Sequence, residues 1–488
     1  MATESGSSMD SVVGLSASMV PVVTIPEGRS AARRWAVGVV MDRLFGEWAF
    51  EARTSLDWQI GVRDPHGQLR PGTVCMPDAF FRGAESNWLA AESLPKLPLP
   101  VFEPSALGIR PKGTSGQVPV LFGQPTIGGV GTSRVELGID IFGSAFFMLS
   151  RYEEAVVSTR DHLDRFPASA SIAGRNGFLD RPIVDEYVEL LWALLARLVP
   201  GLTRRANNFR ISPSHDVDEP SRDTFRGLGA VLRESAGDFL KRRNFGRAVA
   251  GPWHWLHGQR ALHPDDEYNT FGRLMDESEA RGTKSTFFFM AGASNPAFDR
   301  LYELSHPAIR RLILLIHDRG HLIGLHPSFE TYRDAGLLSR EADTLRDTLW
   351  RLGIRQDRLG ARMHYLRWGL PHTWRALVEA GLDFDASLGF ADAPGFRSGT
   401  CHEYRAFDVL SERAMDLAVK PLIAMDVTVM DDKYLGLGTS PQAHEVLCKL
   451  RRRCQAVGGD FSLLWHNNEL CRPGSWDLYS SALGEVGR

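Results

Sequence analysis

The segment FRISPSHDVD at residues 209–218 decides the fold class, because an apolar strand pattern in it leads directly into a cluster of ionisable residues. Side chains two residues apart lie on the same side of an extended strand. We therefore expect the carboxylates of Asp216 and Asp218 to point toward one site. The alternative is that both residues cap a loop or a helix start before Pro220.

Six further apolar or β-branched runs follow this segment, and helical patterns separate most of them. The seven candidate strands are 209–217, 285–291, 321–326, 359–366, 383–390, 421–430 and 460–466, and the main helical patterns are 268–281, 339–352, 371–380 and 442–457. Strands that alternate with helices indicate a parallel sheet, and seven in one run favour a closed or nearly closed barrel. The sequence predicts an α/β fold, a distorted (β/α)7-type barrel over residues 205–488.

Residues 30–204 have a different pattern, which predicts an N-terminal α+β accessory domain. Helical spacing occurs at 31–45, 140–156 and 182–198, and a Pro/Gly-rich stretch covers 65–131. The glycine-rich run at 126–133 lacks the residue order of a phosphate-binding loop, so a hairpin turn is the better interpretation. Residues 1–28 are expected to form a flexible tail.

A long insertion at residues 219–265 separates the first barrel strand from the next helix. It contains several arginines and lysines, followed by Trp253, His254 and Trp255. A solvated helical cap is the simplest interpretation. A lid, or a surface for an anionic partner, is the alternative.

Composition excludes several classes of protein. The chain has 488 residues, 43% of them hydrophobic and 24% charged, which is typical of a globular protein. A net charge of −3 gives no global basic field, so we expect no nucleic-acid partner. The five cysteines are scattered without a CxxC pair, which suits a reducing compartment. With no apolar run of about 18 residues and no basic signal-peptide start, a cytoplasmic protein without a membrane span is expected.

Polar residues cluster where the candidate strands end. Four strands end at or near a histidine, namely His215, His326, His364 and His466. In a parallel barrel these ends converge on one face. Two neighbouring carboxylates repel each other unless a cation lies between them. Imidazoles from other strands would complete an open coordination sphere, which predicts one divalent metal ion, zinc by ligand type.

At these residues the sequence resembles the polysaccharide deacetylase superfamily, over roughly residues 205–470. The matching segments, in chain order, are Asp216-Val217-Asp218, residues 320–326 (GHLIGLH), Arg362-Met363-His364-Tyr365, Asp385-Ala386-Ser387 and Leu464-Trp465-His466. Members of the superfamily remove acetyl groups from sugars on a distorted barrel. The N-terminal part is similar to the accessory domain of a subset of intracellular deacetylase-like proteins.

The resemblance implies a role for each matching residue. Asp216 is expected to be the general base, which Arg362 braces, and His466 the general acid. Asp218 and His326 are expected to bind the metal ion.

Two positions depart from the superfamily pattern. The second histidine of the second motif is replaced by Glu330, and His364 stands where the third motif has proline. We therefore expect His364 to be the third metal ligand, with Glu330 as the second choice. Tyr365 is expected to help form the oxyanion pocket, and Trp465 to contact the substrate, although a core role for the tryptophan is equally compatible with the sequence.

The expected function is that of a metal-dependent hydrolase that removes an N-acetyl or O-acetyl group from a sugar-containing substrate. If the protein is cytoplasmic, a glycan precursor or a small glycosylated metabolite suits it better than an extracellular polymer. Two alternatives stay open: a catalytically degenerate carbohydrate-binding or scaffolding protein, and a hydrolase of a non-glycan amide. The sequence leaves the sugar, the metal and the oligomeric state undetermined.

Overall fold

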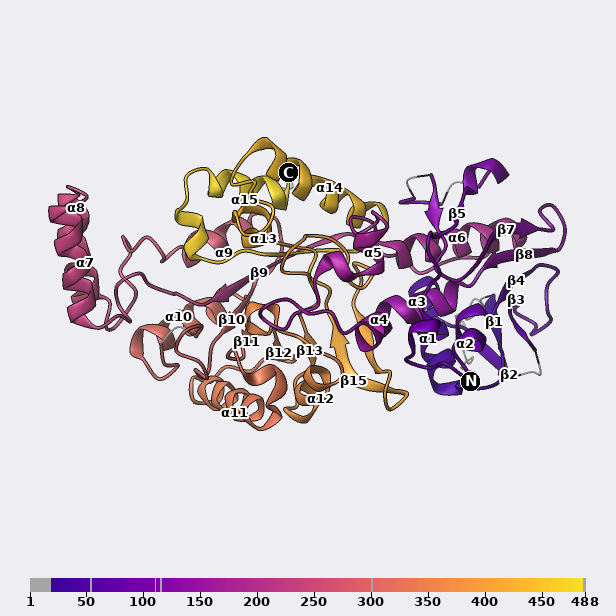
Figure 1. The fold of residues 1–488 in the computed structure, drawn as a ribbon, viewed down its shortest axis with the longest axis horizontal. Coiled ribbons are helices and arrows are strands. Elements are labelled where there is room, and N and C mark those ends of the chain that lie inside the picture. Colours follow the sequence, from indigo (N-terminus) through magenta and orange to yellow (C-terminus); the bar gives the residue numbers. More distant parts are fainter. Residues whose placement is uncertain (1–18, 53–54, 110, 115, 300–301, 486–488) are drawn as a thin grey trace, which may run out of the picture.

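The strands of the computed structural model form two main sheets, and helices cover both (Figure 1). Residues 19–52, 55–109, 111–114, 116–299 and 302–485 are described. The molecule is elongated, with the N-terminal sheet at the right of Figure 1, the larger sheet in the middle and a helical hairpin at the left. The mixed α/β class predicted from the sequence is confirmed.

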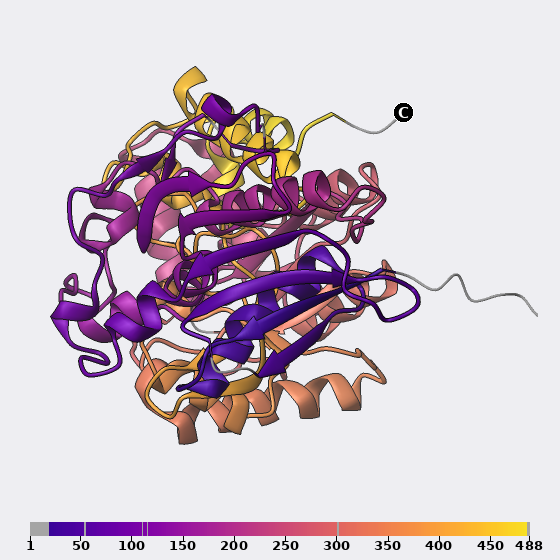
Figure 2. The same cartoon turned by 90° about the vertical axis from the view of Figure 1, so that its right-hand side faces the viewer.

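The N-terminal sheet has six strands and faces the viewer in Figure 2. In spatial order it contains β2 (Ala49–Ala52), β1 (Val20–Ile25), β3 (Asp57–Arg63), β4 (Thr73–Pro77), β8 (Arg134–Ile139) and β7 (Gly123–Gly128). The glycine-rich run connects the antiparallel strands β7 and β8, as the hairpin interpretation predicts. A separate two-stranded sheet pairs β5 (Val101–Phe102) with β6 (Val118–Pro119).

The predicted flexible tail extends too far along the chain. Residues 20–25 form β1, which pairs with β2 on one side and β3 on the other and is almost entirely buried. The segment VPVVTI is apolar and β-branched, and pairing on both edges makes it an interior strand. Residues 1–18 of the predicted tail lie outside the described residues.

The described residues of the N-terminal part form six α-helices, and the first of them lies between the two sheets. They are α1 (Ser30–Leu44), α2 (Ala79–Gly83), α3 (Ile141–Leu149), α4 (Tyr152–Val156), α5 (Ile172–Arg175) and α6 (Ile183–Leu198). Every residue of α3 is buried, because this helix is apolar on all sides. One cluster of buried apolar residues continues from this region into the larger sheet. The expected domain boundary near residue 204 stays a prediction.

The larger sheet has nine strands and is mostly parallel. In spatial order it contains β14 (Tyr404–Asp408), β15 (Arg413–Val419), β13 (Phe384–Asp385), β12 (Gly360–Ala361), β11 (Leu322–Leu325), β10 (Thr286–Phe289), β9 (Arg210–Val217), β17 (Asp460–Leu464) and β16 (Ala424–Met425). Each of the seven predicted strands contains one of these elements. The antiparallel pair of β14 and β15 was not predicted.

Among the described residues no ladder pairs the two edges of this sheet, so the closed barrel stays a prediction. Two backbone hydrogen bonds join the segment after β13 to the segment before β16: Leu422 N–H donates to the Leu388 carbonyl (3.0 Å), and Gly395 N–H donates to the Ile423 carbonyl (2.8 Å). Strands β12, β13 and β16 are two residues long. Irregular backbone thus follows these strands on the side where the predicted site lies.

Helices flank the larger sheet, and the predicted helical patterns each match one of them within a few residues. They are α9 (Phe271–Glu279), α10 (Pro307–Asp318), α11 (Ala335–Arg351), α12 (His372–Glu379), α13 (Asp426–Met430), α14 (Pro441–Ala456) and α15 (Ser475–Leu483). The insertion after β9 contains α7 (Leu228–Leu240) and α8 (Phe245–His257), which project from the body of the protein (Figure 1).

Candidate metal and catalytic site

Strand register places the predicted site residues at one level. Val217 of β9 is level with Phe289 of β10, and Phe289 is level with Leu325 of β11. Because these strands are parallel, Asp218 and His326, which follow β9 and β11, emerge at the same carboxyl end of the sheet with β10 between them.

The same reasoning holds for the other two strands of the site. Leu325 of β11 pairs with Ala361 of β12, so Arg362 and His364 follow at the same edge. On the other side, Leu464 of β17 pairs with Ser214 of β9, which brings His466 level with Asp216.

The shortest contact in the group joins Asp218 to His326. Nε2 of His326 lies 3.1 Å from Oδ1 of Asp218. Both atoms are buried, and among the described residues neither has a hydrogen-bond partner of acceptable geometry. Nδ1 of His326 is 2.6 Å from the Arg362 carbonyl, which fixes Nδ1 as the protonated nitrogen. In the neutral imidazole the lone pair of Nε2 then faces a carboxylate oxygen, an arrangement that suits two ligands of one cation.

His364 completes a three-residue group. Its Nε2 lies 3.8 Å from Oδ2 of Asp218, and its Nδ1 donates to Oδ1 of Asp299 at 3.0 Å. Ligand atoms of Asp218, His326 and His364 all lie within 4.8 Å of one another. A carboxylate that orients a histidine from behind is typical of metal centres. One oxygen donor and two imidazoles fit zinc or another divalent transition metal.

His466 faces the same group from the far side. Its Nε2 lies 3.8 Å from Oδ2 of Asp218. Its Nδ1 donates to Oδ1 of Asp426 (2.8 Å), and its backbone N–H donates to Oδ2 of the same carboxylate (2.6 Å). Asp426 begins α13 and is fully buried. The orientation of the imidazole is therefore set from two directions.

Asp216 is held by Arg362. Nη1 of Arg362 lies 3.1 Å from Oδ1 of Asp216 and donates to Oγ of Ser214 at 2.8 Å. Its Nε donates to the Ala386 carbonyl at 3.0 Å. Both charged side chains are almost completely buried. Oδ2 of Asp216 lies 3.8 Å from Nε2 of His326, so this carboxylate borders the group described above without belonging to it.

The charges of the site shift its pKa values in opposite directions. Burial raises the pKa of Asp218, but the imidazoles of His364 and His326 outweigh burial and hold it well below its usual range. Burial lowers the pKa of His326, and the carboxylates of Asp216 and Asp218 raise it above its ordinary value.

Asp426 dominates the environment of His466. Burial lowers the pKa of this imidazole, and Asp426, with smaller contributions from Asp218 and Asp216, raises it to about 10. For Asp299, burial raises the pKa, whereas the hydrogen bond from His364 and backbone N–H donors bring it to about 2. His466 is therefore a cation, and Asp299 an anion, near neutral pH.

A cavity of about 240 Å³ opens over these residues. Its lining includes Asp216, Asp218, His326, His364 and His466, together with Phe298, Tyr365, Lys433, Tyr434 and Arg165. The volume is below the roughly 300–1,000 Å³ of pockets that bury drug-sized ligands. This volume suits a small acyl group together with part of the molecule to which the acyl group is attached.

Arg165 brings the N-terminal part of the chain into the site. Its Nη1 donates to the Tyr365 carbonyl (3.1 Å), and its Nη2 donates to the Tyr434 hydroxyl (3.3 Å). A neighbouring residue of the same loop, Asp164, accepts a hydrogen bond from the Tyr332 hydroxyl at 2.7 Å. The loop therefore packs onto the face where the strands end.

Trp465 does not lie where a substrate contact requires. The side chain has no solvent exposure, does not line the cavity and packs against Tyr479, with ring centroids 5.3 Å apart. It precedes His466 in an extended segment, so it points to the opposite side and into the core. This corrects the expectation that Trp465 contacts substrate.

Glu330 and Tyr365 occupy different positions relative to the cavity. Glu330 does not line it, and its carboxylate accepts from Asn295 (3.3 Å) and contacts Arg367 (3.5 Å). Tyr365 lines the cavity and has a left-handed backbone conformation with φ of 58°. A non-glycine residue in that conformation is strained, as is common at functional sites.

Sequence reasoning missed Asp299, Asp426 and Arg165 as parts of this site. Asp426 lies inside the predicted strand at 421–430, but β16 already ends at Met425, so the predicted strand end was too late in the chain to mark Asp426. Asp299 and Arg165 lie in loops with no distinctive spacing. Their roles depend on how those loops fold back, which local patterns do not specify.

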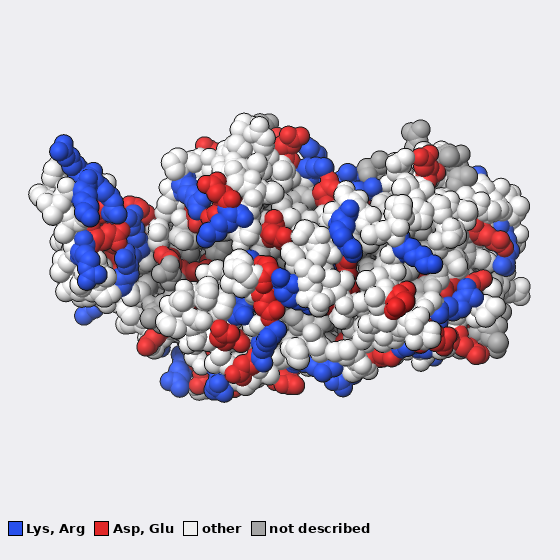
Figure 3. All heavy atoms as spheres, viewed as in Figure 1, with Lys and Arg blue, Asp and Glu red and all other residues white. Residues whose placement is uncertain are grey.

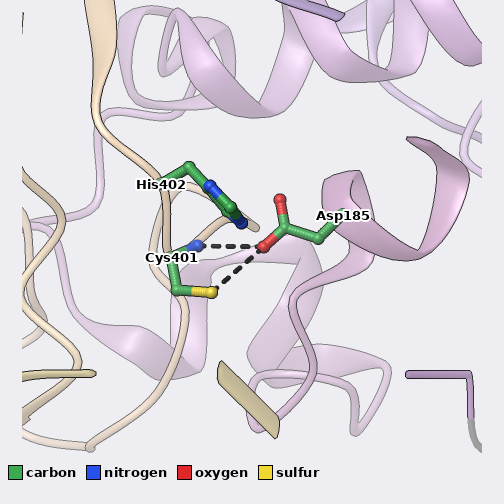
Figure 4. A group of neighbouring side chains, drawn as sticks. All are labelled: Asp185, Cys401 and His402. Atoms are coloured by element: carbon green, nitrogen blue, oxygen red, sulfur yellow. Dashed lines mark hydrogen bonds between the residues drawn. The ribbon is translucent and has the colours of Figure 1, made fainter. Parts of the chain in front are cut away.

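A second acid–histidine–cysteine group lies elsewhere (Figure 4). Asp185 of α6 accepts hydrogen bonds from the backbone N–H and the Sγ of Cys401, at 3.1 and 3.3 Å, and His402 lies beside them. Arg43 already forms an ion pair with Asp185. The buried guanidinium of Arg43 neutralises the Asp185 carboxylate, so the group is a poor site for a cation. Its contacts instead join the N-terminal helices to the segment of Cys401.

Comparisons with known proteins identify a family for only part of the chain. Residues 86–200 match a family of unknown function, DUF7033. No curated protein matches the chain. The matched segment includes the loop that carries Arg165.

Three solved structures are similar at low identity. A protein from Mycobacterium smegmatis assigned as a polysaccharide deacetylase is 19% identical, with a TM-score of 0.37, over 58% of this chain and 85% of that one. The Puue allantoinase is 15% identical, with a TM-score of 0.36 and the same coverage. A protein from Pseudomonas aeruginosa PAO1 assigned as a polysaccharide deacetylase is 16% identical, with a TM-score of 0.34, over 57% and 84%. The functional argument therefore depends on the site itself.

Proposed function

We propose that the protein is a metal-dependent hydrolase that removes an N-acetyl or O-acetyl group from a sugar-containing substrate. The observation that carries this proposal is the convergence of Asp218, His326 and His364, with ligand atoms within 4.8 Å of one another beside the buried Asp216–Arg362 pair. These three residues would hold the metal ion. A divalent ion bound there supplies a Lewis acid that polarises the acyl carbonyl and makes water more acidic.

Asp216 is proposed as the general base. Arg362 holds one of its carboxylate oxygens at 3.1 Å, and the other faces the group of metal ligands. The carboxylate is thus oriented to accept a proton from the attacking water. Because Arg362 is itself anchored on Ser214 and the Ala386 carbonyl, the base cannot rotate away freely.

His466 is proposed as the general acid. Its pKa of about 10 leaves the imidazole protonated near neutral pH, and Nδ1 is engaged by Asp426. The proton on Nε2 therefore faces the cavity and can pass to the leaving nitrogen or oxygen of the substrate. Asp216 and His466 both border the group around Asp218, so one can take a proton while the other donates one.

The substrate would place its acyl group in the small cavity and its sugar outside it. Tyr365 and Arg165 are at the rim of this cavity, and the Arg165 guanidinium fixes the Tyr365 carbonyl. In this proposal Tyr365 helps to position the acyl oxygen, and the N-terminal loop shapes the opening.

Acetate release from N-acetylated amino-sugar oligomers, with and without added zinc, tests the proposal. We expect activity that a chelator abolishes and zinc restores. Asp216→Asn should lower kcat by about 10²–10⁴-fold, with zinc still bound. Zinc binding without acetate release from N- or O-acetylated sugars would favour a carbohydrate-binding or scaffolding role, or another amide substrate. Full activity of Asp216→Asn would refute the mechanism.

A further inference from the structure

The hairpin of α7 and α8 is an ordered unit that projects from the body of the protein (Figure 1). Arg247 of α8 makes a two-point ion pair with Asp223 at its base, at 2.7 and 2.9 Å. Trp255 Nε1 donates to the Arg226 carbonyl at 2.9 Å, and Gly251 packs against Val231 where the two helices meet. The hairpin is therefore held by specific contacts and presents a defined outer surface.

Large apolar side chains are exposed along both helices. On α7 they are Leu228, Leu232, Phe239 and Leu240, and on α8 they are Phe245, Val249, Trp253 and Leu256, with 42–74% of each residue accessible. On α8 and for the first three residues of α7 the spacing is three, four or seven residues, which puts them on one face of each helix, and Leu240 lies next to Phe239 at the end of α7. We call these two rows the apolar stripes. The rings of Phe239 and Phe245 meet at a centroid distance of 5.1 Å, which joins the stripes at the tip.

Positive charge gathers on the same hairpin. Residues 226–260 contain seven arginines or lysines and two acidic residues, whereas the whole chain has a net charge of −3. The view in Figure 3 shows these cations on the projecting part of the molecule. At the tip, Lys241 and Arg243 are exposed, and within the described part of the chain neither forms an ion pair. Apolar and cationic side chains thus share one surface.

We propose that the α7–α8 hairpin docks on the surface of an anionic lipid bilayer. The apolar stripes would enter the boundary between headgroups and acyl chains, and the tip cations would contact the lipid phosphates. Each helix has 13 residues, well below the ~20 that span a bilayer. No described helix is long and apolar enough to cross a membrane. The hairpin therefore lies in the interface.

Charge distinguishes this occupant from a second copy of the chain. Apolar faces of two hairpins could pack together, but a contact with the two tips side by side would bring Lys241 and Arg243 of one copy near the same cations of the other. That repulsion is absent on an anionic surface, where the same residues add to the attraction.

The hairpin is the next helical element after β9 in the chain, and residues 219–227 connect it to the strand end that carries Asp216 and Asp218. The next step rests on the proposed hydrolase function. A hydrolase that is docked on a bilayer would meet glycans that are attached to a lipid, so these are the substrate class we infer. Docking itself does not depend on that function, because lipid binding and acetate release are separate measurements.

Flotation of the full chain with vesicles tests the proposal. We expect binding to vesicles of phosphatidylcholine mixed with phosphatidylglycerol, weaker binding to phosphatidylcholine alone, and release by salt. Lys241→Glu/Arg243→Glu should weaken binding by at least fivefold per cation. Leu240→Ser/Val249→Ser/Trp253→Ser should abolish it. All five side chains are exposed, so the fold should tolerate these changes.

Trp350→Ser and Arg340→Glu on α11 are matched controls, because both residues are exposed but lie outside the hairpin. They should bind vesicles as the wild type does. Absence of binding to anionic vesicles would overturn the proposal, as would equal binding by the hairpin variants. A dimer in solution that the same variants dissociate, without any lipid binding, would assign the stripes to a second copy and overturn it too.

Discussion

Nε2 of His326 and Oδ1 of Asp218 lie 3.1 Å apart, although the two residues follow different strands and neither atom has a hydrogen-bond partner in the described part of the chain. With a neutral imidazole, two buried acceptors in such a position lose free energy unless a third group binds both. His364 directs a third ligand atom to the same place. The first predictions concern the residues that support this group.

Asp299→Asn should weaken zinc binding by roughly 10–100-fold, because the hydrogen bond to Asp299 orients His364 toward the other two ligands. Competition with a chromophoric chelator measures the affinity. Glu330→Gln is the control and should leave the affinity unchanged, since Glu330 does not line the cavity. If Glu330→Gln weakens binding and Asp299→Asn does not, Glu330 is the third ligand.

Asp426→Asn should move the alkaline limb of the kcat profile to lower pH by roughly one to three units. The acid must be protonated to act, and the adjacent Asp426 is what raises the pKa of His466 to about 10. Without that charge the imidazole loses its proton at lower pH. Asp431→Asn, which changes a cavity residue that does not contact His466, should leave the limb in place. An unchanged limb in Asp426→Asn would remove His466 from the role of acid.

Arg165→Ala should lower kcat/KM by about tenfold, the worth of a hydrogen bond from a charged donor. Arg165 is the contact between the N-terminal loop and the rim residues Tyr365 and Tyr434. Steady-state kinetics measure the effect. Arg160→Ala is matched to it, because Arg160 donates only to carbonyls of its own segment and should retain wild-type kinetics. Equal losses in both variants would mean that the loop matters only for folding.

His215 should make the fold less stable in acid. Burial lowers its pKa from 6.5 to about 3 in the folded protein. Above pH 6.5 His215 is neutral in both the folded and the unfolded chain and costs no stability. As the pH falls from 6.5 toward 3, the free energy of unfolding decreases, because the unfolded chain takes up the proton first. Between pH 6.5 and 5 the loss is about 2 kcal/mol.

Urea denaturation at several pH values measures this effect. His215→Asn keeps a donor for the Trp465 carbonyl, which Nδ1 contacts at 2.7 Å, but does not titrate. The stability of this variant should fall less between pH 6.5 and 5 than that of the wild type. If the stability of the wild type and that of His215→Asn fall in parallel as the pH drops, His215 does not take up a proton when the protein unfolds.

Asp185→Ala should destabilise the protein by about 3–5 kcal/mol, because it leaves Arg43 buried without its partner. The same change breaks the contacts of Figure 4. Asp180→Ala is the control, since its ion pair with Lys449 is exposed and is worth about 1 kcal/mol or less. Thermal or chemical denaturation distinguishes them, and equal small losses would mean that the buried pair adds no net stability.

Much of the site was predictable because its residues follow strands in an order that the topology brings together. Asp218, His326 and His364 are each within three residues of a strand end, and parallel pairing places such ends at one edge. The same patterns could not distinguish Trp465 as a core residue. The side of the sheet on which a residue lies depends on where the extended segment begins to bend.

The sequence by itself determined the α/β class, the strands that carry the site and the types of ligand, because hydrophobic periodicity and residue chemistry are local properties. Only the tertiary structure decided that Asp299 and Asp426 support the histidines and that Arg165 reaches the cavity from the N-terminal part. It also decided that the hairpin projects with its apolar stripes exposed. These relationships join residues far apart in the chain, so the packing of loops and helices sets them.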